Sequence, residues 1–167
     1  MLRRTMLRHV SGVALTAPGL LLLGACGSKP PAPPPPPKPA VLRIQIETGA
    51  RLNPDVRARP SPVVLRVYEL KASAQFASAD FLSLQERDQV ALGADLVARE
   101  ELVMRPGETK LISRNLAADT RFVGVTAAFR DLERARWRAL VEVLPARDNT
   151  VNVVLDDVAL QAAGSPR

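Results

Sequence analysis

The stretch Leu42-Arg43-Ile44-Gln45-Ile46-Glu47 decides the fold class. Apolar and polar side chains alternate along it, so an extended backbone places three apolar side chains on one face and three polar ones on the other. This period of two is typical of a strand with one buried face and one face in solvent. The segment is therefore predicted to be a strand packed over a core.

Similar segments follow along the chain. Val63 to Leu70 comes directly after a proline and is rich in β-branched residues, which predicts a second, more buried strand. Pro106-Gly107 fits the central positions of a type II turn between two later strands. Seven or eight short strands joined as antiparallel hairpins predict a mostly β protein, an antiparallel β-sandwich. The further strands are predicted at 98–104, 109–115, 121–130, 136–143 and 150–156.

One segment, from Phe76 to Leu84, departs from the period of two. Phe81 and Leu84 are three residues apart, and Ser78 or Asp80 can cap a helix start, so a short added helix is predicted. Its apolar side chains are expected to pack over an open end or edge of the sandwich and not to meet a ligand.

The N-terminus has the features of an export signal. Three arginines precede an apolar stretch of about 14 residues that contains Pro18, which is too short for a transmembrane helix of roughly 20 residues. Leu23-Gly24-Ala25-Cys26 resembles the bacterial lipobox, and this resemblance implies that Cys26 carries acyl chains. Gly27 in place of Asp implies delivery to the outer membrane. The paired arginines also fit a twin-arginine signal, so the export route stays open.

The chain thus divides into four parts. Residues 1–25 form the signal peptide, and 26–39 form a tether with eight prolines that is predicted to be a polyproline II spacer. Residues 40–161 form the sandwich, and 162–167 are predicted to be a flexible tail.

Composition excludes most chemistry. The 167 residues include one His and one Cys, and loss of residues 1–25 removes that His and three arginines, which lowers the formal net charge from +6 to +3. With no His and with Cys26 assigned to lipid, nucleophilic triads and His- or Cys-ligated metal sites are excluded. We expect no enzymatic activity, no cofactor, no metal and no small-molecule substrate. The low charge and few aromatic residues also argue against nucleic acid.

An ordered series of motifs resembles the type VI secretion outer-membrane lipoproteins, the TssJ or SciN family. Asn53-Pro54-Asp55 and then Arg59-Pro60-Ser61-Pro62, continuing into Val63 to Leu70, match the family's most distinctive stretch, and Ala58 stands where the family has Gly. The series continues with Asp80-Phe81-Leu82, Leu92-Gly93, Pro106-Gly107, Val123-Gly124-Val125 and Trp137-Arg138.

The resemblance implies a transthyretin-like sandwich that is anchored in the outer membrane and faces the periplasm. It also implies binding to the periplasmic domain of the IcmF-like inner-membrane protein TssM through the loop between the first two strands, here 49–61. The expected contacts there are Asn53, Pro54, Asp55, Val56, Arg57, Ala58, Arg59, Pro60 and Ser61.

Loop length and strand direction add to this expectation. Residues 49–62 greatly exceed the two to five residues of an ordinary hairpin loop, and long loops are commonly functional. In an antiparallel order, the loops after the first, third and fifth strands open at one end, opposite the tether's entry at Ala40. Secondary contacts are therefore expected at Arg105, Pro106, Gly107, Leu132, Glu133 and Arg134.

Two other functions stay open at this point. One is a ligand-binding lipoprotein, which a cleft lined by Tyr68 or Trp137 would favour. The other is a pilotin-like chaperone for an outer-membrane channel. A loop that only connects two strands is a further alternative.

Overall fold

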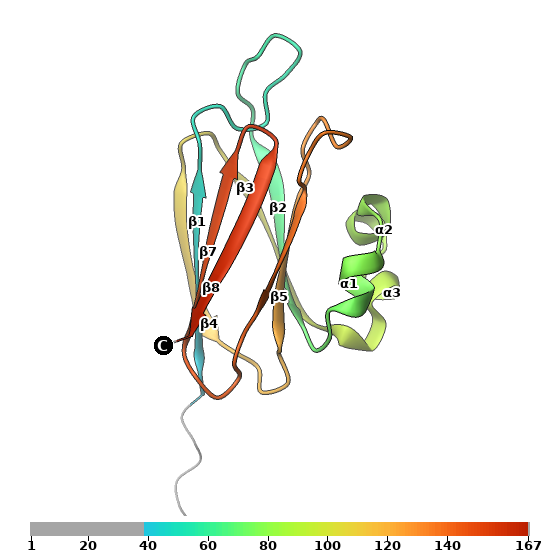
Figure 1. Ribbon diagram of the computed structural model, residues 1–167, viewed down its shortest axis with the longest axis vertical. Helices are drawn as coiled ribbons and strands as arrows, with labels where there is room; N and C mark the ends of the chain where they lie inside the picture. The colour runs from blue at the N-terminus through green and yellow to red at the C-terminus, as the bar shows by residue number, and fades with distance from the viewer. Residues whose placement is uncertain (1–38, 167) are drawn as a thin grey trace, which may run out of the picture. The chain divides into compact units, whose positions relative to one another are not determined.

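Two four-stranded sheets pack face to face in the computed structural model, which describes residues 39–166 (Figure 1). One sheet has the strand order β4-β1-β7-β8 and the other β3-β2-β5-β6. The predicted mostly β sandwich with an added helical segment is confirmed. The strands are β1 (Val41–Thr48), β2 (Val63–Leu70), β3 (Leu96–Met104), β4 (Thr109–Asn115), β5 (Phe122–Ala127), β6 (Arg138–Glu142), β7 (Asn149–Asp156) and β8 (Ala159–Pro166).

The core lies between the sheets and follows the period of two. Leu42, Ile44 and Ile46 of β1 are fully buried, as the alternation predicted. They belong to one apolar cluster that also includes alternate residues of β2, β5 and β7. Burial of such side chains contributes about 25 cal/mol per Å² of apolar surface, so this face fixes the register of each strand.

One strand pair differs from the predicted antiparallel arrangement. β1 pairs with β4 antiparallel, but it pairs with β7 in parallel, from Leu42 opposite Asn149 to Thr48 opposite Leu155. The prediction was wrong for this pair because hydrophobic periodicity defines the buried face of a strand and not its neighbours.

The C-terminal segment is also not the predicted flexible tail. β8 continues the sheet to Pro166 and pairs with β7 along its whole length, so the sandwich does not end at residue 161. β8 has no β-branched residue, so the sequence analysis did not predict it as a strand. Its small residues have a packing role, because a Cβ at Gly164 would lie 2.4 Å from the Val141 side chain of β6.

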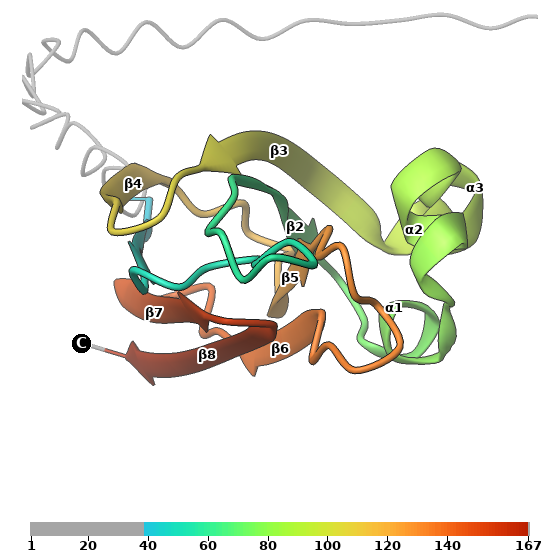
Figure 2. The same cartoon turned by 90° about the horizontal axis from the view of Figure 1, so that it is seen from above.

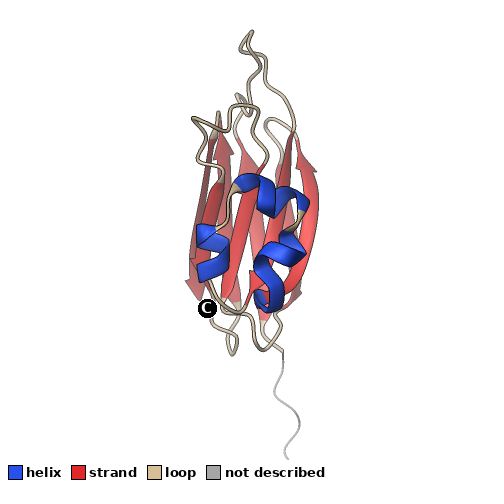
Figure 3. Cartoon of the chain, turned by 90° about the vertical axis from the view of Figure 1, so that its right-hand side faces the viewer, coloured by secondary structure: helices blue, strands red, loops and turns tan. Residues whose placement is uncertain are grey.

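Three short helices cover the outer face of the second sheet (Figures 2 and 3). They are α1 (Ala74–Ser78), α2 (Phe81–Glu86) and α3 (Asp88–Leu92), followed by the 3-10 turn η1 (Gly93–Asp95). One helix packed over an end or edge was predicted, whereas the structure has three on a sheet face. The chain breaks at Ala79, which is extended, and Asp80 then caps α2 by accepting the N–H of Ser83 at 2.9 Å.

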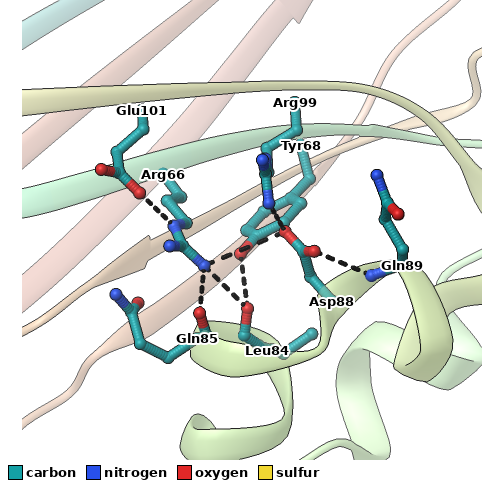
Figure 4. A network of polar contacts seen from close by, with 8 residues as sticks. All are labelled: Arg66, Tyr68, Leu84, Gln85, Asp88, Gln89, Arg99 and Glu101. Carbon is teal, nitrogen blue, oxygen red and sulfur yellow. Dashed lines mark hydrogen bonds and ion pairs between the residues drawn. The ribbon is translucent and has the colours of Figure 1, made fainter.

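A polar network fastens these helices to β2 and β3 (Figure 4). Arg66 of β2 donates to the carbonyl oxygens of Leu84 (3.1 Å) and Gln85 (2.6 Å) and pairs with Glu101 of β3 at 2.6 Å. The buried Asp88 of α3 pairs with Arg99 of β3 at 2.6 Å. Each buried charge therefore has a partner, as burial in a low-dielectric site requires.

No helix among residues 39–166 is long and apolar enough to cross a membrane. The predicted signal peptide, Cys26 and nearly all of the tether lie outside the described residues.

Candidate functional site

Four connections gather at one end of the sandwich, which we call the loop end (upper part of Figure 1). They are the β1–β2 loop (49–62), the β3–β4 turn (105–108), the β5–β6 loop (128–137) and the β7–β8 turn (157–158). Backbone hydrogen bonds join them, such as Gly107 N–H to Gly49 O at 3.2 Å. Strand direction predicted the first three, and the turn before the unpredicted β8 is the fourth.

Asn53 connects three of these segments from a buried position. Its backbone N–H donates to Asp157 O at 2.7 Å, and its Nδ2 donates to Pro62 O at 2.8 Å. Its Oδ1 accepts the N–H of Arg130 at 2.8 Å. Asn53 has a φ of +49°, which asparagine tolerates better than most residues, and only 3% of it is exposed. The structure thus places this predicted contact residue inside the loop end.

Beyond Asn53, the β1–β2 loop closes into a tight tip around Asp55. The Asp55 carboxylate accepts the backbone N–H groups of Arg57 (2.8 Å) and Arg59 (3.0 Å), and it pairs with the Arg59 guanidinium at 2.7 Å. The backbone N–H of Arg59, followed by its side chain, lowers the pKa of Asp55 to about 2. Ala58 completes the turn at a φ of +60°. The closed tip leaves the Val56 side chain fully exposed.

The β5–β6 loop is braced by the same chemistry. Asp131 accepts the N–H of Arg134 at 3.3 Å and its Nε at 2.6 Å, and the two side chains form an ion pair. The side-chain hydrogen bond from Arg134 lowers the pKa of Asp131. Both loops therefore present a turn closed by an aspartate and an arginine that follows it.

An open depression of about 700 Å³ lies between these two braced loops. Of the predicted contacts, it brings together Pro54, Asp55 and Val56 with Leu132, Glu133 and Arg134. Arg130 and Asp131 also line it and were not among the predicted contacts, although the predicted loop, 131–135, begins at Asp131. The depression offers apolar and charged groups of both signs, which suits a protein surface better than a single small ligand.

The predicted contacts in the β3–β4 turn lie elsewhere at the loop end. Thr48 Oγ1 donates to Arg105 O at 2.6 Å, and Gly107 has the positive φ of +73° expected in its turn. Arg105, Pro106 and Gly107 do not line the depression between the other two loops.

The rings that could have indicated a ligand cleft are used in packing. Tyr68 is buried beneath α2, its hydroxyl donates to Leu84 O at 3.1 Å, and burial raises its pKa. Trp137 packs edge-on against Phe81 at 5.3 Å, with the Arg138 guanidinium 4.9 Å from its ring centroid. Within residues 39–166, no three His, Cys, Asp or Glu residues group closely enough to hold a metal ion.

A sequence profile of the T6SS-SciN family, described as type VI secretion lipoproteins with the names VasD, EvfM and TssJ, matches residues 40–158. The chain belongs to this family. The T6SS-SciN family comprises structural membrane-complex lipoproteins and is not a known enzyme family.

Solved structures agree with membership of the T6SS-SciN family. The T6SS lipoprotein TssJ1 from Pseudomonas aeruginosa is 36% identical, with a TM-score of 0.74 over 78% of this chain and 99% of that one. Lip from Serratia marcescens, a membrane-bound component of the type VI secretion system, is 25% identical, with a TM-score of 0.68 over 74% and 97%. A chain of a type VI membrane complex is 25% identical, with a TM-score of 0.64 over 74% and 98%. A search of curated protein sequences gave no match.

Proposed function

We propose that this type VI secretion lipoprotein is anchored in the outer membrane through acylated Cys26 and binds the periplasmic domain of the IcmF-like protein TssM. One observation supports the docking site most strongly: the loop end is opposite the end at which β1 begins, beside Ala40 (Figure 1). A domain held at its N-terminal end therefore offers the loop end to a partner rooted in the inner membrane. The protein acts by binding and carries out no reaction.

The exposed groups of the two braced loops make the contacts with TssM in this proposal. The Val56 side chain projects from the tip and can enter an apolar recess of the partner, while the neighbouring Arg57 side chain is exposed. Such a residue pair combines an apolar anchor with a charge that steers encounter. Ala58, Arg59 and Pro60 are exposed beside them, and Leu132, Glu133 and Arg134 border the depression from the other loop.

The docking site is tested by measuring binding of the purified protein to the periplasmic fragment of TssM. Replacing both Val56 and Arg57 by Ser removes an exposed apolar residue and an exposed arginine from the tip. We expect the Kd to rise at least about tenfold, which corresponds to ~1.4 kcal/mol.

The matched control makes the same two changes at the other end of the sandwich. Leu144 and Arg147 are an exposed leucine and an exposed arginine in the β6–β7 connection. Replacing both by Ser is expected to leave the Kd within about threefold. Equal losses from the two double variants would refute the loop end as the docking site.

The anchor is tested separately by Cys26→Ser. Loss of the acyl chains removes the membrane attachment, so we expect this variant to disappear from the outer-membrane fraction of fractionated cells. A variant that stays firmly in that fraction would show that the anchor is elsewhere.

A further inference from the structure

Asn53 holds together two loops that lie far apart in the sequence. Its side chain reaches Pro62 at the start of β2, nine residues away, and Arg130 after β5, 77 residues away. The side-chain amide thus donates to one backbone segment, at Pro62, and accepts from a different one, at Arg130. Leu52, the residue before Asn53, holds the base of the β1–β2 loop in place. Its side chain is fully buried in the main core, and its carbonyl oxygen accepts the N–H of Ser61 at 2.9 Å.

The depression between the loops depends on this link. One wall is 54–56, which directly follows Asn53, and the other is 130–134, whose first N–H is the one that Asn53 accepts. The hydrogen bond therefore joins the two walls at their base. Within each wall, an aspartate and an arginine brace the loop, Asp55 with Arg59 and Asp131 with Arg134, whereas the hydrogen bond from Arg130 to Asn53 runs between the walls.

A preformed surface binds more tightly than one that must be ordered by its partner, because ordering loops during association costs conformational entropy. A loop of 14 residues is long enough for this cost to be large. If the two walls were not joined, a partner that contacts both would have to fix their separation itself.

We propose that Asn53 is a positioning residue for docking: it fixes the β1–β2 and β5–β6 loops to each other so that the partner meets them as one preformed surface. This inference rests on the proposed docking function of the loop end. Asn53 itself, being buried, contributes no contact to the partner. Its removal weakens docking by loosening the relation between the two walls.

The chain offers a matched control in Asn149, at the opposite end of the sandwich. Asn149 is also 3% exposed, and its side chain bonds the backbone of the β6–β7 connection. Its Oδ1 accepts Leu144 N–H at 2.9 Å, and its Nδ2 donates to Leu144 O at 2.9 Å and Arg147 O at 2.6 Å. Both asparagines brace a connection from within, but only Asn53 lies at the loop end.

The experiment compares Asn53→Gly with Asn149→Ala in the whole protein. Glycine is chosen at residue 53 because the positive φ there disfavours alanine, whereas Asn149 is in β7 and has no positive φ. Three quantities are measured for each variant: thermal stability, the Kd for the periplasmic fragment of TssM, and hydrogen exchange of the Arg130 amide.

We expect both variants to lower the thermal midpoint. Only Asn53→Gly should raise the Kd, by about tenfold, and accelerate exchange at the Arg130 amide by at least about tenfold. If Asn53 only stabilised the fold, its replacement would lower the thermal midpoint without this selective loss of affinity for the fragment.

Two results would overturn the inference, and they differ from each other. If the wild type binds the fragment and both variants bind it within about twofold of each other, Asn53 has no positioning role. If the wild type does not bind the fragment, the proposed function itself fails, and the docking role of Asn53 fails with it. Unchanged exchange at Arg130 in Asn53→Gly would independently show that the two loops are not joined by this side chain.

Discussion

The carboxylate of Asp55 is the most strongly perturbed acid of the loop end. Its pKa is lowered from 3.8 to about 2, first by the backbone N–H of Arg59 and then by the Arg59 side chain. A depressed folded-state pKa stabilises the closed tip above about pH 4, and this contribution is lost as the pH falls toward 2. An NMR titration of the Asp55 carboxyl carbon should therefore have its midpoint near 2.

Arg59→Ala is the control for this titration. It removes the guanidinium but leaves both backbone N–H donors, so the pKa of Asp55 should rise only part of the way to 3.8. A wild-type midpoint at or above 3.8 would mean that the tip is open in solution.

Ala58 occupies a backbone conformation that suits glycine, the residue that the family resemblance led us to expect there. Its φ of +60° costs a residue with a Cβ roughly 1 to 2 kcal/mol, of which glycine's greater unfolded-state entropy cancels about 0.4 to 1 kcal/mol. Ala58→Gly should therefore increase the free energy of unfolding by up to about 1.6 kcal/mol, measured by urea denaturation.

Ala146→Gly is the comparison, since Ala146 is an exposed loop alanine without a positive φ. Here glycine only increases the entropy of the unfolded chain, so stability should fall. A change of the same sign in both variants would contradict the strain at Ala58.

The sequence could indicate the proposed docking loop but not the position of each of its side chains. Loop length and the family motif predicted 49–61 with Asn53 among the direct contacts, whereas the structure buries Asn53. Its hydrogen-bond acceptor role depends on Arg130, 77 residues later, and such a partner is set by tertiary structure and not by local pattern. The pairs Asp55 with Arg59 and Asp131 with Arg134 are local and could have been inferred from spacing.

At the scale of elements, α1 packs closely on the sheet because Gly124 of β5 has no side chain. A Cβ at Gly124 of β5 would lie 2.8 Å from the ring of Phe76 in α1. Overpacking of this kind typically costs 1 to 3 kcal/mol, so Gly124→Ala should lower the free energy of unfolding by about 2 kcal/mol in urea denaturation.

A double-mutant cycle separates this clash from a loss of strand propensity. Adding Phe76→Leu to Gly124→Ala shortens the opposing side chain, so the double variant should be more stable than the two single changes predict. Strictly additive changes would show that the ring does not lie on Gly124.

Strand boundaries were predicted best where turn residues frame a clear apolar pattern. The ranges 63–70 and 109–115 agree with β2 and β4 residue for residue. β5 and β6 are shorter than predicted, and β8 was missed because its small residues give no apolar alternation. One helix was predicted where the structure has three, because the extended Ala79 separates α1 from α2 and because Asp88 of α3 is buried against arginines from β2 and β3.

At the scale of the whole molecule, Arg114 of β4 links the two sheets through ion pairs with Glu69 of β2 and, at 2.6 Å, with Glu100 of β3. Glu69 of β2 is 3% exposed and pairs with Arg114 of β4 at 2.8 Å, while Thr120 donates to its other oxygen at 3.0 Å. Arg114→Met leaves a buried carboxylate without its cation and should cost about 3 kcal/mol, measured by urea denaturation at pH 7.

Replacing both charges tests the cause of that loss. Glu69→Leu combined with Arg114→Met removes the uncompensated charge, so this double variant should recover most of the stability. If it unfolds as easily as Arg114→Met alone, the loss comes from packing and not from charge.

The even number of strands has a practical consequence for anyone who labels this protein. The register places Leu42 opposite Asn149 and Asn149 opposite Pro166, so the first and last strands start and finish in the same row of the sheet. A fluorescent reporter fused after β8 would emerge at the end of the sandwich where β1 begins, away from the four connections. A C-terminal fusion should therefore leave binding to TssM intact, whereas an epitope inserted at Arg57 should block this binding.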